Sequence, residues 1–158
     1  MDKISTTYTA DEQTIPRLTK GFLSFYYSQA RVRAVYALFI VLLAFNSAVG
    51  QSATLGINVA LVVYMVLLPV MIYRNTKRAL RIWASPGMSM HTVVGSDSLT
   101  ISTQQATSEV KFSAFRQLAV RGDCVILRQA NTRIYNILPR QLFPDNSLVI
   151  LRQHIPQK

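Results

Sequence analysis

The dominant feature of the hydropathy pattern is one long uncharged segment. Residues 34–73 form a run of 40 positions without Asp, Glu, Lys, Arg or His. A helix needs about 20 mostly apolar residues to cross a bilayer core of about 30 Å, so the run has the length of two spans. Gly, Asn, Gln and Ser gather in its middle, around Gly50 and Gln51, which is typical of a turn. We therefore predict a transmembrane hairpin over residues 33–73, with helices at about 33–49 and 54–73.

The alternative to a membrane hairpin is a helical hairpin buried in a soluble core. A soluble hairpin carries a polar face toward water, and no such face is visible in residues 34–73. A signal peptide is also disfavoured, because 33 residues precede the run and no small-residue cleavage site closes a short apolar core. The pattern therefore predicts a multi-pass membrane protein.

Basic residues gather on both outer flanks of the hairpin, whereas the connection between its helices carries no charge. An excess of Lys and Arg marks the cytoplasmic side of a membrane, so we predict that both termini are cytoplasmic. The same side chains are candidates for contacts with the membrane surface, because they attract anionic lipid head groups. They are Arg31, Arg33, Arg74, Lys77, Arg78 and Arg81.

Small side chains recur on one face of the first predicted span, at spacings of 3, 4, 3 and 4. Small seams allow helices in lipid to approach closely. We expect this helix-packing seam to contact the second helix of the same chain or, alternatively, a second copy of the protein. Its members are Ala34, Ala37, Val41, Ala44 and Ala48.

The segment before the spans, residues 1–32, is predicted to hold a short strand and an amphipathic helix. Residues 4–9 alternate as a strand does, and Asp11 and Glu12 then open a helix with the acidic start that the helix dipole favours. Its apolar positions recur at helical spacing, and we expect the helix to lie along the membrane surface. The strand is a candidate to join the sheet predicted after the spans.

The segment after the spans is predicted to be a basic juxtamembrane linker followed by a small β domain. Residues 74–87 form the linker, which ends in the helix-breaking triplet at residues 85–87. Residues 88–158 contain about six short alternating stretches separated by turns, followed by a helix from Asp145 to about His154 with Asp145 as its N-cap. The predicted fold class is an α+β membrane protein, in which a curved antiparallel sheet or partial barrel is closed by a C-terminal helix.

The stretch Tyr135–Phe143 resembles the closing strand, Leu-Pro-basic connector and final helix of the YcxB-like proteins of bacterial membranes. The order of a strand and helix, two spans and a small domain is also similar to that family over nearly the whole chain. The family often has a Trp in one connector, where this chain has Phe112 and Phe115. The resemblance implies a pleckstrin-homology-like (PH-like) domain and a bacterial cytoplasmic (inner) membrane, and it implies no catalytic residues.

The net charge of +10 would by itself suggest a nucleic-acid partner. The basic flanks of the spans explain much of it, and no zinc spacing or nucleic-acid-reading motif accompanies the charge, so we expect no nucleic acid. The single cysteine, Cys124, excludes an intrachain disulfide and is expected to be a small buried residue.

Catalytic and metal-binding patterns are not evident. His91 and His154 lack a Cys or carboxylate at ligand spacing, and the chain contains no nucleophile-elbow pattern and no glycine-rich phosphate loop. We therefore expect no enzyme activity, cofactor or metal. Arg140, in the connector after the predicted closing strand, is the candidate ligand contact, with a solvated charge as the alternative.

These observations favour a non-enzymatic, membrane-anchored interaction module that binds a protein or a lipid head group at the cytoplasmic face of the inner membrane. The alternative is an immunity-type protein that neutralises a membrane-directed toxin. Small size, two spans and the lack of a catalytic pattern suit either role. The expected partners are the bilayer and either an unidentified protein, such as a toxin, or a second copy of the chain.

Overall fold

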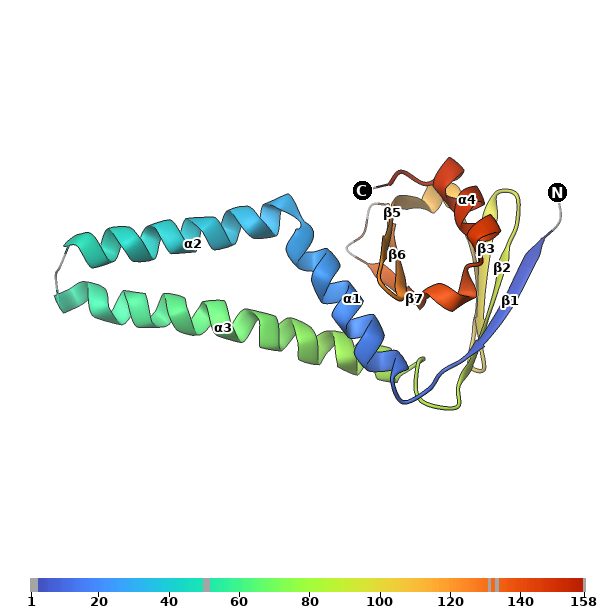
Figure 1. The fold of residues 1–158 in the computed structure, drawn as a ribbon, viewed down its shortest axis with the longest axis horizontal. Coiled ribbons are helices and arrows are strands. Elements are labelled where there is room, and N and C mark those ends of the chain that lie inside the picture. The colour runs from blue at the N-terminus through green and yellow to red at the C-terminus, as the bar shows by residue number, and fades with distance from the viewer. Residues whose placement is uncertain (1–2, 50–51, 131, 133, 158) are drawn as a thin grey trace. The chain divides into compact units, whose positions relative to one another are not determined.

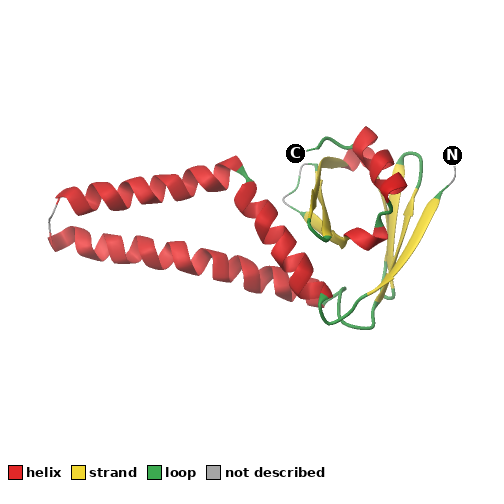
Figure 2. Cartoon of the chain, in the orientation of Figure 1, coloured by secondary structure: helices red, strands yellow, loops and turns green. Residues whose placement is uncertain are grey.

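The computed structural model describes residues 3–49, 52–130, 132 and 134–157. Within them the chain is α+β, with four α-helices and seven strands in two antiparallel sheets (Figure 1). It divides into two compact units. One, here the β unit, comprises Met1–Phe22 and Lys77–Lys158, and the other, here the helical unit, comprises Leu23–Thr76. All the strands belong to the β unit (Figure 2).

The β unit contains a sheet of four strands and a sheet of three strands. The first sheet has the order β1-β2-β3-β4, formed by β1 (Ile4–Thr9), β2 (Ser89–Val94), β3 (Ser98–Thr103) and β4 (Thr107–Lys111). The second has the order β5-β6-β7, formed by β5 (Phe115–Arg121), β6 (Cys124–Gln129) and β7 (Tyr135–Pro139). A short 3-10 turn, Phe112–Ala114, separates the sheets in sequence.

Strand β1 is an integral member of the first sheet. It pairs with β2 in antiparallel register over six residue pairs, from Ile4 opposite Val94 to Thr9 opposite Ser89. This strand was a candidate member of the sheet from its sequence, and the pairing confirms it. The β unit is therefore assembled from segments on both sides of the predicted hairpin, whereas the sequence had divided the chain at residue 88.

The core of the β unit lies between the two sheets and helix α4 (Asp145–His154). Met90, Leu99, Leu127 and Leu151 come from both sheets and the helix, and each has essentially no exposed surface. The bounds of α4 confirm the helix predicted there. The predicted N-cap was wrong: Pro144 is the capping residue, without a side-chain cap bond, and Asp145 stands in the first turn.

Helix α1 (Thr14–Ser28) begins in the β unit and packs its apolar stripe on protein. Ile15, Leu18 and Phe22 are buried, and the Phe22 ring meets the Tyr135 ring of β7 edge-on with centroids 5.6 Å apart. The expectation that this helix lies along the membrane surface was therefore wrong for this stripe. It covers the outer face of the second sheet, which explains why β6 is buried on both faces from Cys124 to Leu127.

The helical unit contains helix α2 (Ala30–Val49) and most of helix α3 (Ser52–Arg81). Both predicted spans are confirmed as helices, but α3 continues through Pro69 and ends at Arg81. The first half of the predicted linker is therefore helical. Gly50 and Gln51, where the turn was predicted, lie outside the described residues.

The two long helices each have one less exposed face. On α2 this face is formed by Val32, Tyr36, Phe39, Leu43 and Asn46. On α3 it is formed by Asn58, Leu61, Met65, Leu68 and Ile72. Both sets recur at spacings of 3 and 4, as one face of a helix does. The Phe39 and Tyr64 rings meet edge-on with centroids 5.6 Å apart, which joins the two helices directly.

Candidate functional site

The surfaces of α2 and α3 are apolar and exposed. The two helices are long and apolar enough to cross a membrane, and none of the most apolar stretch of either is buried. Val41, Phe45 and Leu55 are 62%, 66% and 71% exposed. Soluble monomers rarely expose contiguous apolar patches of more than a few hundred Å². Water is therefore an unfavourable solvent for this part of the chain.

The basic residues that follow the second predicted span share one face of a helix. Because α3 continues to Arg81, Arg74, Lys77, Arg78 and Arg81 stand at helical positions i, i+3, i+4 and i+7. The three arginines among them are exposed. A basic stripe on an ordered helix is a more defined surface than the irregular linker that the sequence predicted.

On the other flank of the hairpin, Arg31 and Arg33 are exposed near the start of α2. The Arg33 Nε donates to the backbone carbonyl of Tyr27 at 3.3 Å, which leaves the rest of its guanidinium available. The residues predicted to contact a membrane surface are therefore largely accessible on both flanks.

The predicted small-residue seam does not contact α3. All five of its side chains, from Ala34 to Ala48, are exposed, whereas the less exposed face of α2 carries the larger side chains described above. That face includes Phe39, whose ring meets Tyr64 of α3, and Tyr36, whose ring meets Tyr27 of α1. The expectation of packing on the second helix was wrong, and packing on a second copy stays a prediction.

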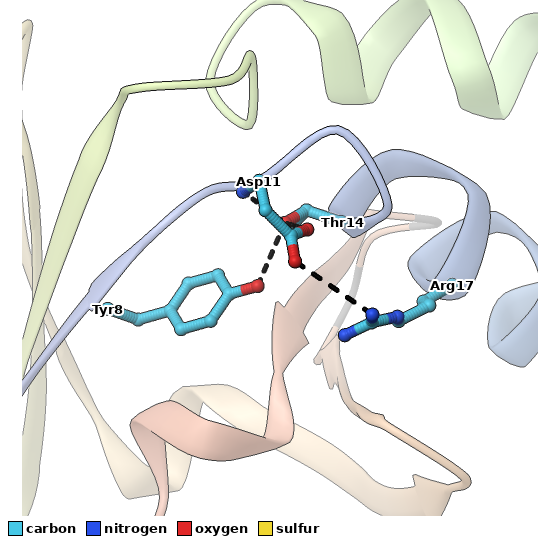
Figure 3. Close-up of polar contacts among 4 residues, drawn as sticks. All are labelled: Tyr8, Asp11, Thr14 and Arg17. Atoms are coloured by element: carbon cyan, nitrogen blue, oxygen red, sulfur yellow. Dashed lines mark hydrogen bonds and ion pairs between the residues drawn. The ribbon is translucent and has the colours of Figure 1, made fainter.

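A compact hydrogen-bond cluster joins β1 to α1 (Figure 3). The Thr14 hydroxyl donates to Asp11 Oδ1 at 2.7 Å and accepts from the Asp11 backbone N–H at 2.8 Å. The Tyr8 hydroxyl lies 2.8 Å from the Thr14 hydroxyl oxygen. Tyr8 is the donor in this bond, because the single hydroxyl proton of Thr14 is already donated to Asp11. Arg17 lies 3.8 Å from Asp11 Oδ2. The hydrogen bond from Thr14, with the positive charge of Arg17, lowers the pKa of Asp11.

The Thr14 hydroxyl has all its hydrogen-bonding capacity in use, so the role of the cluster is to hold the start of α1 against β1. Asp11 supplies the negative charge near the helix N-terminus that the dipole favours, and the Thr14 oxygen has no remaining capacity for a ligand. The sequence identified the acidic start of the helix but not the roles of Tyr8 and Thr14.

Neither histidine belongs to a metal-binding group. His91 lies 3.0 Å from Thr7 Oγ1 through Nδ1, and His154 Nδ1 donates to the Ile150 carbonyl at 2.9 Å. Across the described residues, no three His, Cys, Asp or Glu side chains gather where they could hold a metal ion.

Cys124 is fully buried and donates to the Arg121 carbonyl at 3.2 Å. Burial raises the pKa of its thiol to about 11. The thiol is therefore protonated at neutral pH and is a poor nucleophile, because the thiolate is the reactive form.

Arg140 belongs to the 3-10 turn Arg140–Leu142 that follows β7. Its Nη2 lies 3.2 Å from Asp145 Oδ1, and both side chains are at least half exposed. The candidate ligand contact is thus already paired with the carboxylate that the sequence had assigned to helix capping. An incoming anion would share the Arg140 guanidinium with Asp145.

A small polar cavity lies beside β5. Its volume is about 190 Å³, and it is lined by Leu118, Ala119, Val120, Arg121, Arg152 and Gln157. Neither Arg121 nor Arg152 was among the site residues predicted from the sequence. One residue ends β5 and the other lies on α4, and only the fold brings them to the same cavity.

No family model matches the chain, and no match was found among curated proteins or solved structures. The resemblance to the YcxB-like family therefore stays a prediction that rests on Tyr135–Phe143.

Proposed function

We propose that this chain is a membrane-anchored interaction module without enzymatic activity, whose β unit binds a partner at the cytoplasmic face of a bacterial inner membrane. The observation that carries the proposal is the pairing of β1 with β2. One strand precedes the two apolar helices and the other follows them. A chain that leaves a sheet and returns to it must cross a bilayer an even number of times, so one folded unit sits on one side.

The basic residues on both flanks of the hairpin support the cytoplasmic side of the membrane as the location of the β unit. Arg31 and Arg33 precede the first apolar stretch, and the stripe from Arg74 to Arg81 follows the second. Both flanks carry the Lys and Arg excess typical of the cytoplasmic side. The stripe also adds electrostatic attraction to anionic head groups, about 1 kcal/mol for each Lys or Arg near the surface.

The architecture of the β unit supports a binding role of the PH-like kind. A PH-like domain consists of a four-stranded sheet, a three-stranded sheet and a C-terminal helix over the core. The β unit has the same elements in the same order. On this proposal the transmembrane hairpin is an insertion between the first two strands of that domain. A fold by itself does not specify a ligand, so the partner is sought in the surface of the unit.

Alkaline carbonate extraction of membranes from cells that express the full chain tests the anchoring. The chain is expected to stay in the membrane pellet. Val63→Arg places a charge within the second span, at a penalty of about 2.5–3.5 kcal/mol near a helix centre, and is expected to weaken integration. Val149→Arg, at an exposed position of α4, is the matched control. Release of the unchanged protein, or a monodisperse sample in buffer without detergent, would contradict the proposal.

A further inference from the structure

Strand β4 is the last strand of the four-stranded sheet, so one side of its backbone faces away from β3. Two hydrogen bonds, one at each end of the β3–β4 ladder, fix which residues point that way. The Thr103 N–H donates to the Ala106 carbonyl at 2.8 Å, and the Phe112 N–H donates to the Asp97 carbonyl at 2.8 Å. Because backbone groups alternate along an antiparallel ladder, the even-numbered residues of β4 bond to β3 and the odd-numbered ones point outward. The outward residues are Thr107, Glu109 and Lys111.

Strand β4 is also the most exposed strand of its sheet. Four of its five residues are exposed, and Val110 is half-buried. The described segments near the two ends of the chain pair elsewhere, β1 with β2 at the other edge of the sheet and Pro156 with Leu118 of β5. Among the described residues, only β3 bonds to the backbone of β4. An exposed edge strand is a template for pairing with another chain.

The charges of β4 are complementary to those of β4 itself. Glu109 and Lys111 stand two positions apart, so both side chains lie on the same face of the sheet. When two copies of the strand run antiparallel, one register places each Glu109 opposite the Lys111 of the other copy. Both positions point outward, so each of these pairs would exchange two backbone hydrogen bonds. In this register the Val110 residues of the two copies meet at the two-fold axis.

Charge distinguishes this register from its neighbours. A shift that places Glu109 opposite Glu109 brings like charges together, which is destabilising. The opposite shift places Glu109 opposite Thr107 and leaves Lys111 opposite Gln105 in the hairpin turn. In the favoured register the carboxylate is already oriented, because the Ser98 hydroxyl donates to Glu109 Oε1 at 2.8 Å. Strand β3 carries no charged residue that would compete with the pairing.

We propose that the chain forms a homodimer in which β4 pairs antiparallel with β4 of a second copy, with each Glu109 opposite the Lys111 of the other. The two four-stranded sheets would then form one sheet of eight strands. This inference goes beyond the proposed function, because it concerns how the β unit assembles and does not depend on which partner the module binds. It also uses a different surface from the small-residue seam on α2.

The balance of charge on β4 favours a second copy over other occupants. The strand carries one acid and one base, so a uniformly acidic or uniformly basic segment would meet a like charge at one of the two positions. An anionic lipid surface would be repelled by Glu109 as much as it is attracted by Lys111. A second copy supplies both complementary charges and the backbone of a strand. Anchoring in one membrane would raise the effective concentration of the two copies.

Disulfide trapping of the full chain in freshly broken cells, without detergent, tests the pairing. Val110→Cys places thiols at the axis, where the two Cα atoms of a pair without mutual backbone bonds lie about 4.5 Å apart. A disulfide spans Cα separations of about 4.4–6.8 Å. Thr107→Cys is the matched control, because the two copies of this position would lie about 20 Å apart, six residues along the strand. Oxidation with copper phenanthroline and a non-reducing gel detect the linked dimer. The unchanged chain, in which Cys124 is buried, reports the background.

Charge exchange in the Val110→Cys chain tests the register. Glu109→Lys places lysine opposite lysine, and Lys111→Glu places glutamate opposite glutamate, so each should lower the rate of cross-linking by about tenfold. The two variants, expressed together with different tags, should cross-link to each other, and the double variant should regain the original rate. Arg116→Glu, at an exposed position of β5, changes the charge of the same unit and should have no effect. Thermal melts of the purified variants establish that each is folded.

Absence of a linked dimer in the folded Val110→Cys chain, or equal cross-linking of Thr107→Cys, would overturn the proposal. So would single charge variants that cross-link at the original rate, or a double variant that does not recover. A disulfide from Val110→Cys to a protein of different mass, in place of the dimer, would identify another occupant of the edge and overturn it too. Carbonate extraction reports the anchoring independently of these results.

Discussion

Thr6 of β1 lies opposite Thr92 of β2, although both long helices lie between them in the sequence. The pair belongs to a run of six, so the first sheet cannot form until the chain has returned from α3. Residues before and after the apolar helices are therefore held in one folded unit.

Cysteine labelling in intact cells checks the consequence of this pairing. Thr7→Cys and Thr107→Cys place exposed thiols on β1 and β4, and Ser52→Cys substitutes the first residue of α3, between the two apolar helices. Only Ser52→Cys should react with a membrane-impermeant maleimide, and all three should react after the cells are lysed. Labelling of Thr7→Cys but not Thr107→Cys in intact cells would mean an odd number of crossings, which the β1–β2 pairing forbids.

The contact between α2 and α3 predicts unequal effects of two phenylalanines on the same helix. Phe39 meets Tyr64 edge-on, whereas Phe45 is 66% exposed. Phe39→Ala should lower the free energy of unfolding in detergent by about 1 kcal/mol, the value of an aromatic pair. Phe45→Ala should change it by much less, and equal effects of the two substitutions would contradict the observed facing of the helices. Titration with SDS, followed by circular dichroism, measures both.

The order of helices and strands could be predicted from the sequence because the apolar and polar positions follow clear patterns. The uncharged run predicted both helices, and the alternation after residue 88 predicted six strands, all of which are present. The end of α3 was misplaced because a run of basic residues after a span is also typical of a linker. Nothing in the composition of residues 74–81 disfavours a helix, so the helix simply continues.

The site was harder to predict because it depends on which side chains the fold brings together. Arg121 and Arg152 are 31 positions apart, and no local pattern identifies β5 as an edge strand. Asp145 illustrates the converse: its type and position fit a cap, but the side chain pairs with Arg140 instead. The small residues of the predicted seam on α2 share an exposed face, whereas the less exposed face of that helix carries larger side chains.

The hydrogen bonds of the Thr14 hydroxyl predict that its removal destabilises the fold even when the shape of the side chain is kept. Thr14 is buried and bonds to Tyr8 and Asp11. Thr14→Val keeps the shape but leaves the Tyr8 hydroxyl and the Asp11 N–H without their acceptor, so the free energy of unfolding should fall by about 1–3 kcal/mol. Thr9→Val is the control, because Thr9 is exposed and has only a long 3.4 Å contact with Ser89. Urea denaturation in mild detergent measures both, and equal midpoints would contradict the role of the cluster.

The same cluster gives the β unit a predicted acid sensitivity. The hydrogen bond from Thr14 and the charge of Arg17 hold the pKa of Asp11 below its usual value of 3.8. A carboxyl whose pKa is depressed by folding stabilises the folded state above its unfolded pKa, and this stabilisation is lost as the pH falls through the folded pKa. Asp11→Asn should therefore be less stable than the wild type at pH 7, and the difference should shrink below about pH 4. Urea midpoints across pH 3–7 measure the difference, and a gap that does not vary with pH would show that the charge of Asp11 is not involved.

The close packing around Gly21 predicts that a larger side chain at this position destabilises the fold. A Cβ at this position would meet the Cys124 sulfur and would lie 3.0 Å from the Arg121 carbonyl oxygen, whereas a Cβ at Gly56 would meet nothing within 4 Å. Alanine is the better helix former by about 1 kcal/mol, so Gly56→Ala should be neutral or stabilising. Gly21→Ala should destabilise by about 1–3 kcal/mol, as overpacking does.

The double variant Gly21→Ala with Cys124→Ala separates the two contacts at this position. It removes the sulfur but keeps the backbone oxygen, so it should recover only part of the stability relative to Cys124→Ala alone. Thermal melting by circular dichroism compares the four proteins with the wild type. If Gly21→Ala had the same melting temperature as Gly56→Ala, the close approach of α1 to the turn between β5 and β6 would be incorrect. The packing that buries both faces of β6 would then be incorrect too.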